Sequence, residues 1–268
     1  ERETISNTEF PIPNKELLHR FEQLYTGAVN DVLREFCFLN QALPNRIVPL
    51  REYKTVAGFA FTVKSAPNAK ITGEMEFRSQ MLDEMHEDSF ILWDTSKDEK
   101  ATLWGGVMTA TAKSKKVKAA CIDGGIRDTF QILEADFPVF YKYRLSNGSL
   151  GRCLITHFQI VLQIDDVTIK PGDIILGDID GVLVVPRDVA YEVCPVLRED
   201  GFSFDLEFFV AAKCFGHVRL VEVPVHINRT GSSTVNISGI LKTAFEILRI
   251  FKRARLTLEY ETEKSSLQ

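Results

Sequence analysis

The apolar positions of the first 200 residues follow two different spacings. In residues 14–24, 26–37 and 75–85 the apolar side chains recur at helical spacing, which predicts amphipathic helices. Shorter runs rich in apolar and β-branched residues predict buried strands. These runs comprise residues 54–65, 89–94, 117–123, 137–143, 157–164, a run ending at Leu176, and 182–186. Because strands alternate with helices early and cluster late, we predict a mixed α/β sandwich of three-layer character rather than a pure Rossmann fold.

Residues 104–128, with the sequence WGGVMTATAKSKKVKAACIDGGIRD, join a helix start to a buried strand. Gly105 and Gly106 open an Ala-rich segment with helical spacing. The unpaired N–H groups and the positive dipole end of such a helix start form a small anion site. After the strand VKAACID, Gly124 and Gly125 predict a tight turn with unusual backbone dihedral angles.

A charged pair, Arg127 and Asp128, follows the predicted turn, where open α/β sheets bind ligands. A guanidinium group can grip a carboxylate with two hydrogen bonds, and a carboxylate can hold a hard divalent cation. The pair would therefore hold a metal-chelating 2-oxo acid at both ends, and the metal would stabilise an enolate of pyruvate. Taken alone, however, we favour the interpretation of this dipeptide as an ion pair that only starts a helix. Asp123 is either a ligand or an Asx-turn residue, and we favour the turn.

Composition narrows the class of protein. The 268 residues are 45% hydrophobic and 26% charged, with a formal net charge of −5, which is ordinary for a globular protein and lacks the basic face of a nucleic-acid-binding protein. The five cysteines are scattered, with no CxxC pair, so we expect reduced thiols and a cytoplasmic protein rather than a disulfide framework or a zinc site. No run approaches the ~18 apolar residues of a membrane helix, and we expect no signal sequence.

Six blocks of sequence resemble the RraA-like family in order and spacing. They are TVAGFAFTV, ILWDT, WGGVMTATAK, AACIDGGIRD, FPVF and IKPGDIILGDIDGVLVVP. The resemblance covers about residues 14–199, and the family includes 4-hydroxy-4-methyl-2-oxoglutarate aldolases, oxaloacetate decarboxylases and regulators of a ribonuclease. It implies a mixed α/β sandwich with a swivelling-domain-like sheet, assembled as a homotrimer or a hexamer with sites between subunits.

The resemblance also implies roles for the residues of the central stretch. Arg127 would be the catalytic residue that binds the substrate carboxylate, and Asp128 would hold Mg²⁺ or Mn²⁺ largely through water molecules. The implied function is that of a divalent-metal-dependent lyase that decarboxylates oxaloacetate, cleaves 4-hydroxy-4-methyl-2-oxoglutarate to pyruvate, or does both. The backbone amides that would anchor the 2-oxo acid are those of Gly105, Gly106, Val107 and Met108.

One position departs from the aldolase pattern. Aldolase members carry an acidic residue just after the glycine of the helix start, where it helps to activate a water molecule, whereas this chain has Gly106. Loss of general acid–base assistance lowers a rate by ~10²–10⁴-fold, so we expect decarboxylation to survive better than aldol cleavage. A catalytically silent regulatory or binding protein is the alternative, because the ribonuclease-regulator branch tends to have glycine there.

The pattern changes near residue 200. The stretches GFSFDLE and GHVRLVEVPV, a Gly-Ser-Ser loop and a basic helix over 236–256 resemble the C-terminal part of family-2 glycosyltransferases of the polyprenyl-phosphate sugar synthase type. Asp205 and Glu207 would be acceptor-side acids there, but the nucleotide-sugar half is missing, so we interpret both as structural. A glycosyltransferase-related fragment is the third candidate function. A solvated face explains the basic helix at least as well as membrane contact does.

We therefore divide the chain into four parts. They are an N-terminal arm (1–13), an RraA-like domain (14–199), a glycosyltransferase-like α/β segment (200–257) and a disordered tail (258–268). The partners that we expect are a small 2-oxo acid and other copies of the chain, and no nucleic acid.

Overall fold

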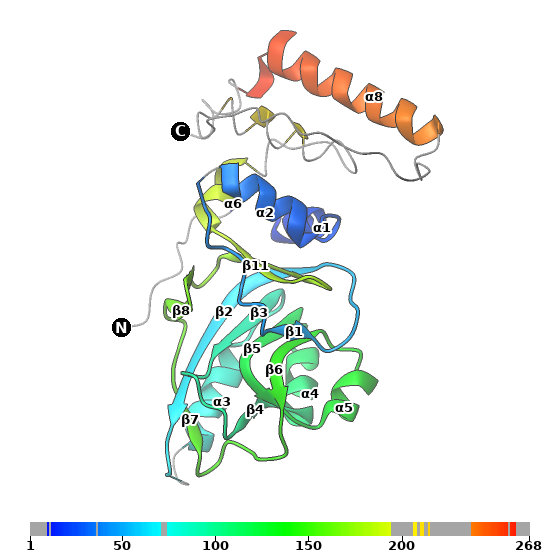
Figure 1. Ribbon diagram of the computed structural model, residues 1–268. Coiled ribbons are helices and arrows are strands. Elements are labelled where there is room, and N and C mark those ends of the chain that lie inside the picture. The colour runs from blue at the N-terminus through cyan, green and yellow to red at the C-terminus, as the bar shows by residue number, and fades with distance from the viewer. Residues whose placement is uncertain are drawn as a thin grey trace.

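The computed structural model describes residues 10, 12–35, 37–70, 74–193, 206–207, 210–211, 214, 237–256 and 258–260. Nine of the described strands form one mixed sheet (Figure 1). They are β1 (Val48–Pro49), β2 (Val56–Pro67), β3 (Ser89–Asp94), β4 (Thr102–Trp104), β5 (Ala119–Ile126), β6 (Val139–Arg144), β7 (Cys153–Phe158), β10 (Ile174–Asp178) and β11 (Gly181–Val185). Their order is β1-β6-β5-β3-β2-β10-β11, with β4 joined to β5 and β7 joined to β2.

A separate hairpin and several helices make up the rest of the described secondary structure. The hairpin consists of β8 (Leu162–Ile164) and β9 (Val167–Ile169). The helices are α1 (Asn14–Glu22), α2 (Thr26–Glu35), α3 (Glu74–Glu84), α4 (Gly106–Ser114), α5 (Thr129–Glu134), α6 (Arg187–Val193), α8 (Ile237–Phe251) and the π-helical turn η2 (Lys252–Leu256).

The middle of the sheet is parallel. β2, β3, β5 and β6 run side by side in one direction, and β4 joins β5 in the same sense. Every residue of β3 and of β5 is buried, as is usual for parallel strands that are covered on both faces, and this explains their continuous apolar runs. Antiparallel β10 and β11 complete the sheet along β2. The predicted mixed α/β fold is confirmed.

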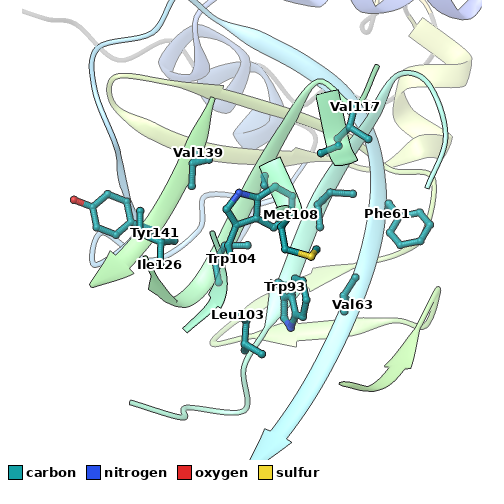
Figure 2. Packing of buried hydrophobic residues seen from close by; sticks show 14 of the residues in the cluster. Phe61, Val63, Trp93, Leu103, Trp104, Met108, Val117, Ile126, Val139 and Tyr141 are labelled. Atoms are coloured by element: carbon teal, nitrogen blue, oxygen red, sulfur yellow. The ribbon is translucent and has the colours of Figure 1, made fainter. Parts of the chain in front are cut away.

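Alternate residues of the central strands belong to two different buried clusters, one on each face of the sheet. Ile91 and Trp93 face the cluster beneath α3, α4 and α5. Figure 2 shows Trp93 and Met108 within this cluster. Phe90 and Leu92 face the opposite cluster, which the β8–β9 hairpin covers. The alternation follows from the two-residue period of a strand. A third cluster joins α1, α2 and α6 to β10 and β11, on the side away from α3, α4 and α5 in Figure 1.

Gly124 and Gly125 do not form the predicted turn. β5 continues through both and ends at Ile126, and neither glycine has a positive φ. Instead, the register against β6 slips between Ile122 and Gly125, a β-bulge of the kind at which glycine is common. A Cβ on Gly124 would lie 2.4 Å from Thr95 Cγ2. Glycine is therefore needed here for close packing between strands and not for a turn.

Two other predicted elements differ from the structure. The run 157–164 divides into β7 and β8, because the chain leaves the strand at Gln159, which has a positive φ of 55°. The predicted helix 236–256 divides into α8 and η2. The remaining helices and strands predicted before residue 190 are present, with ends that differ by up to three residues.

The predicted N-terminal arm and the predicted disordered C-terminal tail each contain a buried residue. Phe10 lies in the predicted arm, yet it is buried and its ring stacks on Phe59 with 5.9 Å between ring centroids. Tyr260 lies in the predicted disordered tail, yet it is fully buried and donates a hydrogen bond to Glu207 at 2.8 Å. The predictions are wrong at these two positions, while residues 1–9 and 261–268 lie outside the described part.

The segment after residue 200 is described only in part. Glu207 is fully buried and pairs with Arg253, which also pairs with Glu259 at 3.0 Å. This buried cluster supports the structural interpretation of Glu207. Asp205 and most of the stretch that resembles glycosyltransferases lie outside the described residues. Among the described helices, none combines the length and the hydropathy that crossing a membrane requires.

Candidate functional site

Two neighbouring parallel strands bring the predicted site residues together. β4 ends at Trp104 and β5 at Ile126, and these two residues are register partners. The N–H of Arg127 donates to the carbonyl oxygen of Trp104 at 3.0 Å. The start of α4 and the charged pair therefore lie side by side at the carboxyl ends of the strands, where open α/β sheets place ligands.

Asp128 is held against the N-terminus of α4. Its Oδ2 accepts a hydrogen bond from the N–H of Gly106 at 3.1 Å. A Cβ on Gly105 would lie 2.6 Å from this oxygen, so glycine leaves room for the carboxylate. One of the amides predicted to anchor a substrate is thus engaged by Asp128. The N–H groups of Val107 and Met108 have no acceptor in the described part of the chain, and they remain available to an anion.

A cavity of ≈ 460 Å³ opens beside the pair. Arg127 Nε lies 3.8 Å from Asp128 Oδ2, and 48% and 39% of the two side chains are exposed. Both residues line the cavity, together with Gly105, Val107 and Met108, whereas Gly106 does not. Apolar side chains complete the wall, as in most small-molecule sites. They include Leu103, Trp104 and Leu150.

Three arginines that line this cavity lie close to the loop between β6 and β7. Arg78, from α3, donates to Ser149 Oγ at 3.0 Å, and Arg152 donates to the carbonyl oxygen of Gly148 at 3.3 Å. Arg127 also lies close to this loop, because a Cβ on Gly148 would be only 2.8 Å from Arg127 Nη1. Arg78 and Arg152 were not predicted as site residues, because nothing in their local sequence separates them from ordinary surface residues.

Gly106 lies beside Asp128, between the cavity-lining residues Gly105 and Val107, and a side chain at this position would start toward α5. A Cβ on Gly106 would lie 1.7 Å from Gln131 Oε1 and 2.9 Å from Gln131 Cδ. The exposed side chain of Gln131 therefore occupies the room that an acidic side chain at position 106 would need. Because the contact is made by the end of a flexible side chain, an acid at position 106 would displace it at small cost.

Asp123 is neither a site ligand nor a turn residue. It is buried within β5, and Arg46 donates to both of its carboxylate oxygens, at 3.1 and 3.2 Å. Arg46 also pairs with Asp165, between β8 and β9, and these hydrogen bonds lower the pKa of Asp165. The network ties the hairpin to the sheet, so the carboxylate of Asp123 has a structural role.

The sequence was also compared with known families. The profile of the RraA-like family, described as Aldolase/RraA, matches residues 26–184. The chain belongs to the RraA-like family. The matched range contains the start of α4, the Arg127–Asp128 pair and the three arginines of the cavity, so the candidate site lies wholly within the RraA-like part of the chain.

Relatives of this RraA-like protein carry several names. Protein DlpA of Legionella pneumophila is 30% identical over 182 residues, which cover 68% of this chain but 29% of DlpA, so the chain spans less than a third of that relative. A protein of Halalkalibacterium halodurans, provisionally named a 4-hydroxy-4-methyl-2-oxoglutarate aldolase, is 27% identical over 175 residues, or 64% of this chain and 77% of that one. A crystal structure described as novel cellulases from microbes associated with the gut ecosystem is 80% identical, with a TM-score of 0.69 over 71% of this chain and 86% of that chain.

The cavity of this RraA-like protein offers one carboxylate to a divalent cation. In the described part of the chain no three His, Cys, Asp or Glu side chains gather closely enough to enclose a metal ion. Asp128 is the acidic residue that lines the cavity, and its Oδ1 accepts no hydrogen bond from the described residues. Mg²⁺ usually keeps several water molecules and binds through one or two carboxylates plus its substrate. The donor set therefore fits a water-rich Mg²⁺ or Mn²⁺ site and not an all-protein cage.

Proposed function

We propose that this RraA-like protein is a divalent-metal-dependent lyase of 2-oxo acids, which decarboxylates oxaloacetate, cleaves 4-hydroxy-4-methyl-2-oxoglutarate to pyruvate, or does both. The observation that carries the proposal is the placement of Arg127 and Asp128 on one cavity beside the available amides of α4. Membership of a family that includes lyases, and a relative provisionally named as such an aldolase, agree with it.

The residues of the cavity have separable roles in this proposal. Arg127 donates two hydrogen bonds to the substrate carboxylate, and the N–H groups of Val107 and Met108 donate to its oxygens with the help of the α4 dipole. These contacts orient the C3–C4 bond, which breaks in either reaction. A bound Mg²⁺ or Mn²⁺, held by Asp128 and water molecules, would withdraw electrons from the 2-oxo group and stabilise the enolate of pyruvate.

The proposal predicts that the purified protein releases pyruvate from oxaloacetate only with a divalent cation. The rate with Mg²⁺ should exceed that of the same Mg²⁺ solution without protein, and excess EDTA should lower it at least ~10-fold, because a Lewis acid contributes several kcal/mol to the stabilisation of developing charge. Pyruvate is measured with lactate dehydrogenase and NADH. Equal rates with Mg²⁺ and with EDTA, or no rate above the protein-free solution, would contradict the proposal.

The Gly106–Gln131 contact predicts how the balance between the two reactions can be changed. Gly106→Asp should raise cleavage of 4-hydroxy-4-methyl-2-oxoglutarate by ~10-fold, because general acid–base assistance is typically worth ~10²–10⁴ and the new carboxylate has no optimised surroundings. The double variant with Gln131→Ala should be at least as active, since nothing must then be displaced. Pyruvate release from both substrates is compared.

Gly106→Asn is the matched control for this variant, since asparagine has the shape of aspartate without its charge. If Asn and Asp at position 106 change aldol cleavage equally, the missing carboxylate is not what limits that reaction.

A catalytically silent binding protein is the second candidate. It is favoured by Gly106, whose neighbour Gln131 fills the place of the acid. Binding of a 2-oxo acid or a protein partner without metal-dependent turnover would support this candidate over the lyase.

Glycoside hydrolysis and sugar transfer have less support from the cavity. The similar crystal structure is described as cellulases, but glycoside hydrolases use a pair of carboxylates that flank the bond to be broken. The described lining residues of this cavity include one acid, Asp128. A glycosyltransferase-related role rests on the segment after residue 200, most of which is outside the described residues. Homo-oligomerisation and a cytoplasmic location also remain proposals. Val107 and Phe130, near the starts of α4 and α5, are each 78% exposed and are available to a second copy.

A further inference from the structure

The Gly148–Ser149 loop holds three guanidinium groups close together. Arg152 and Arg127 contact Gly148, and Arg78 contacts Ser149. Since consecutive Cα atoms are about 3.8 Å apart, the three groups lie within reach of one small molecule. All three arginines line the same cavity.

The charges of the cavity wall do not balance. Against three arginines, the described lining residues include a single carboxylate, that of Asp128. A single guanidinium is enough to bind a monocarboxylate. One additional guanidinium would be explained by its contact with the loop, but two additional ones indicate a ligand that carries further negative charge. A guanidinium carries five N–H donors, so the hydrogen bond from Arg152 to Gly148 leaves others for a ligand.

Arg78 is also held in place by contacts other than the loop. Its guanidinium carbon lies 5.8 Å from the centre of the Trp93 ring, and its Nη1 lies 3.8 Å from Met108 Sδ. A cation held over an aromatic face and beside the start of α4 is positioned in advance of binding, which reduces the entropy that binding must overcome.

We propose that Arg78 and Arg152 form a second carboxylate subsite, which binds the distal carboxylate that both proposed substrates carry. The inference rests on the proposed function in one respect, namely that Arg127 holds the carboxylate next to the 2-oxo group. Arg78 and Arg152 are then specificity-determining residues that bind the distal carboxylate.

The test compares two unreactive probes of equal chain length by isothermal titration in Mg²⁺. 2-Oxoglutarate carries the distal carboxylate, and 2-oxovalerate has a methyl group there. The full-length protein should bind 2-oxoglutarate about tenfold more tightly, because hydrogen bonds to a charged group contribute ~1.5–3 kcal/mol. Arg152→Met and Arg78→Met should each remove most of this difference while leaving the affinity for 2-oxovalerate within about twofold.

Two further variants separate a subsite from a general effect of charge. Arg20→Met removes one positive charge from α1, where Arg20 pairs with Glu16, and it should leave both affinities unchanged. Arg127→Met should weaken both probes. Circular dichroism checks the folding of each variant, and exposed Arg152 provides a test even if Arg78→Met does not fold.

The outcomes distinguish this inference from the proposed lyase activity. Equal affinities of the unaltered protein for both probes, or equal weakening of both by Arg152→Met, would overturn the subsite even if oxaloacetate is turned over. A tenfold preference for 2-oxoglutarate that depends on Arg78 and Arg152 would establish the subsite even if no turnover is found.

Discussion

Replacing Arg127 with methionine should lower kcat/KM for oxaloacetate by about 100- to 1,000-fold without unfolding the protein. Two hydrogen bonds from a guanidinium to a carboxylate contribute ~3–4 kcal/mol together, and each 1.4 kcal/mol corresponds to a factor of ten. Methionine keeps the aliphatic stem, whose Cγ lies against Gly105. The coupled pyruvate assay gives kcat and KM, and circular dichroism reports the fold.

Arg144→Met is the matched control for this substitution. Arg144 is the register partner of Ile126 on β6, next to Arg127, but its guanidinium lies over the ring of Tyr141 at 5.3 Å, and it does not line the cavity. Its removal should change kcat/KM by less than about twofold. If both variants lose activity equally, the carboxylate-binding role of Arg127 is rejected.

Replacing Gly125 with alanine should lower the free energy of unfolding by about 3–5 kcal/mol. The new Cβ would lie 2.4 Å from Tyr143 Cε2 and 2.9 Å from the carbonyl oxygen of Ala101. Tyr143 cannot move away freely, because its hydroxyl proton is shared between the carbonyl oxygens of Asp98 and Ala101, each 2.9 Å from the hydroxyl oxygen. Overpacking costs ~1–3 kcal/mol, and each lost hydrogen bond about 1 kcal/mol more.

Burial, followed by nearby acidic side chains, raises the pKa of Tyr143 to about 12, so this hydroxyl remains a donor throughout the neutral range. Urea unfolding at matched protein concentration measures the change. Gly27→Ala is the control, because its Cβ would make ordinary contacts of 3.6 Å with Tyr25, within helix α2. Alanine there should be neutral or slightly stabilising. Equal stability of both variants would show that the close approach at Gly125 is not required.

The bulge of β5 illustrates where a local interpretation of glycine fails. In sequence, Gly124 and Gly125 resemble a turn, because consecutive glycines are common where φ is positive. In the fold both glycines remain in the strand. Because they have no side chain, Thr95 and Tyr143 can pack closely against them. Those neighbours come from other strand ends, so their approach is not encoded near the glycines.

The sequence by itself determined the mixed α/β class, most of the helices and strands, and the meeting of Gly105–Met108 with Arg127 and Asp128. These follow from periodicity, from the resemblance to the RraA-like family and from the rule that ligands bind at the carboxyl ends of parallel strands. Each depends on residues near one another in the chain, or on strand direction.

Tertiary structure alone decided the other partners of the site. Arg78 and Arg152 reach the cavity because α3 and the β6–β7 loop meet there, and Gln131 fills the room beside Gly106 from another helix. Arg46 binds Asp123 across 77 positions of the chain. Contacts between side chains distant in sequence are fixed by the packing of whole elements, which no local pattern of residues specifies.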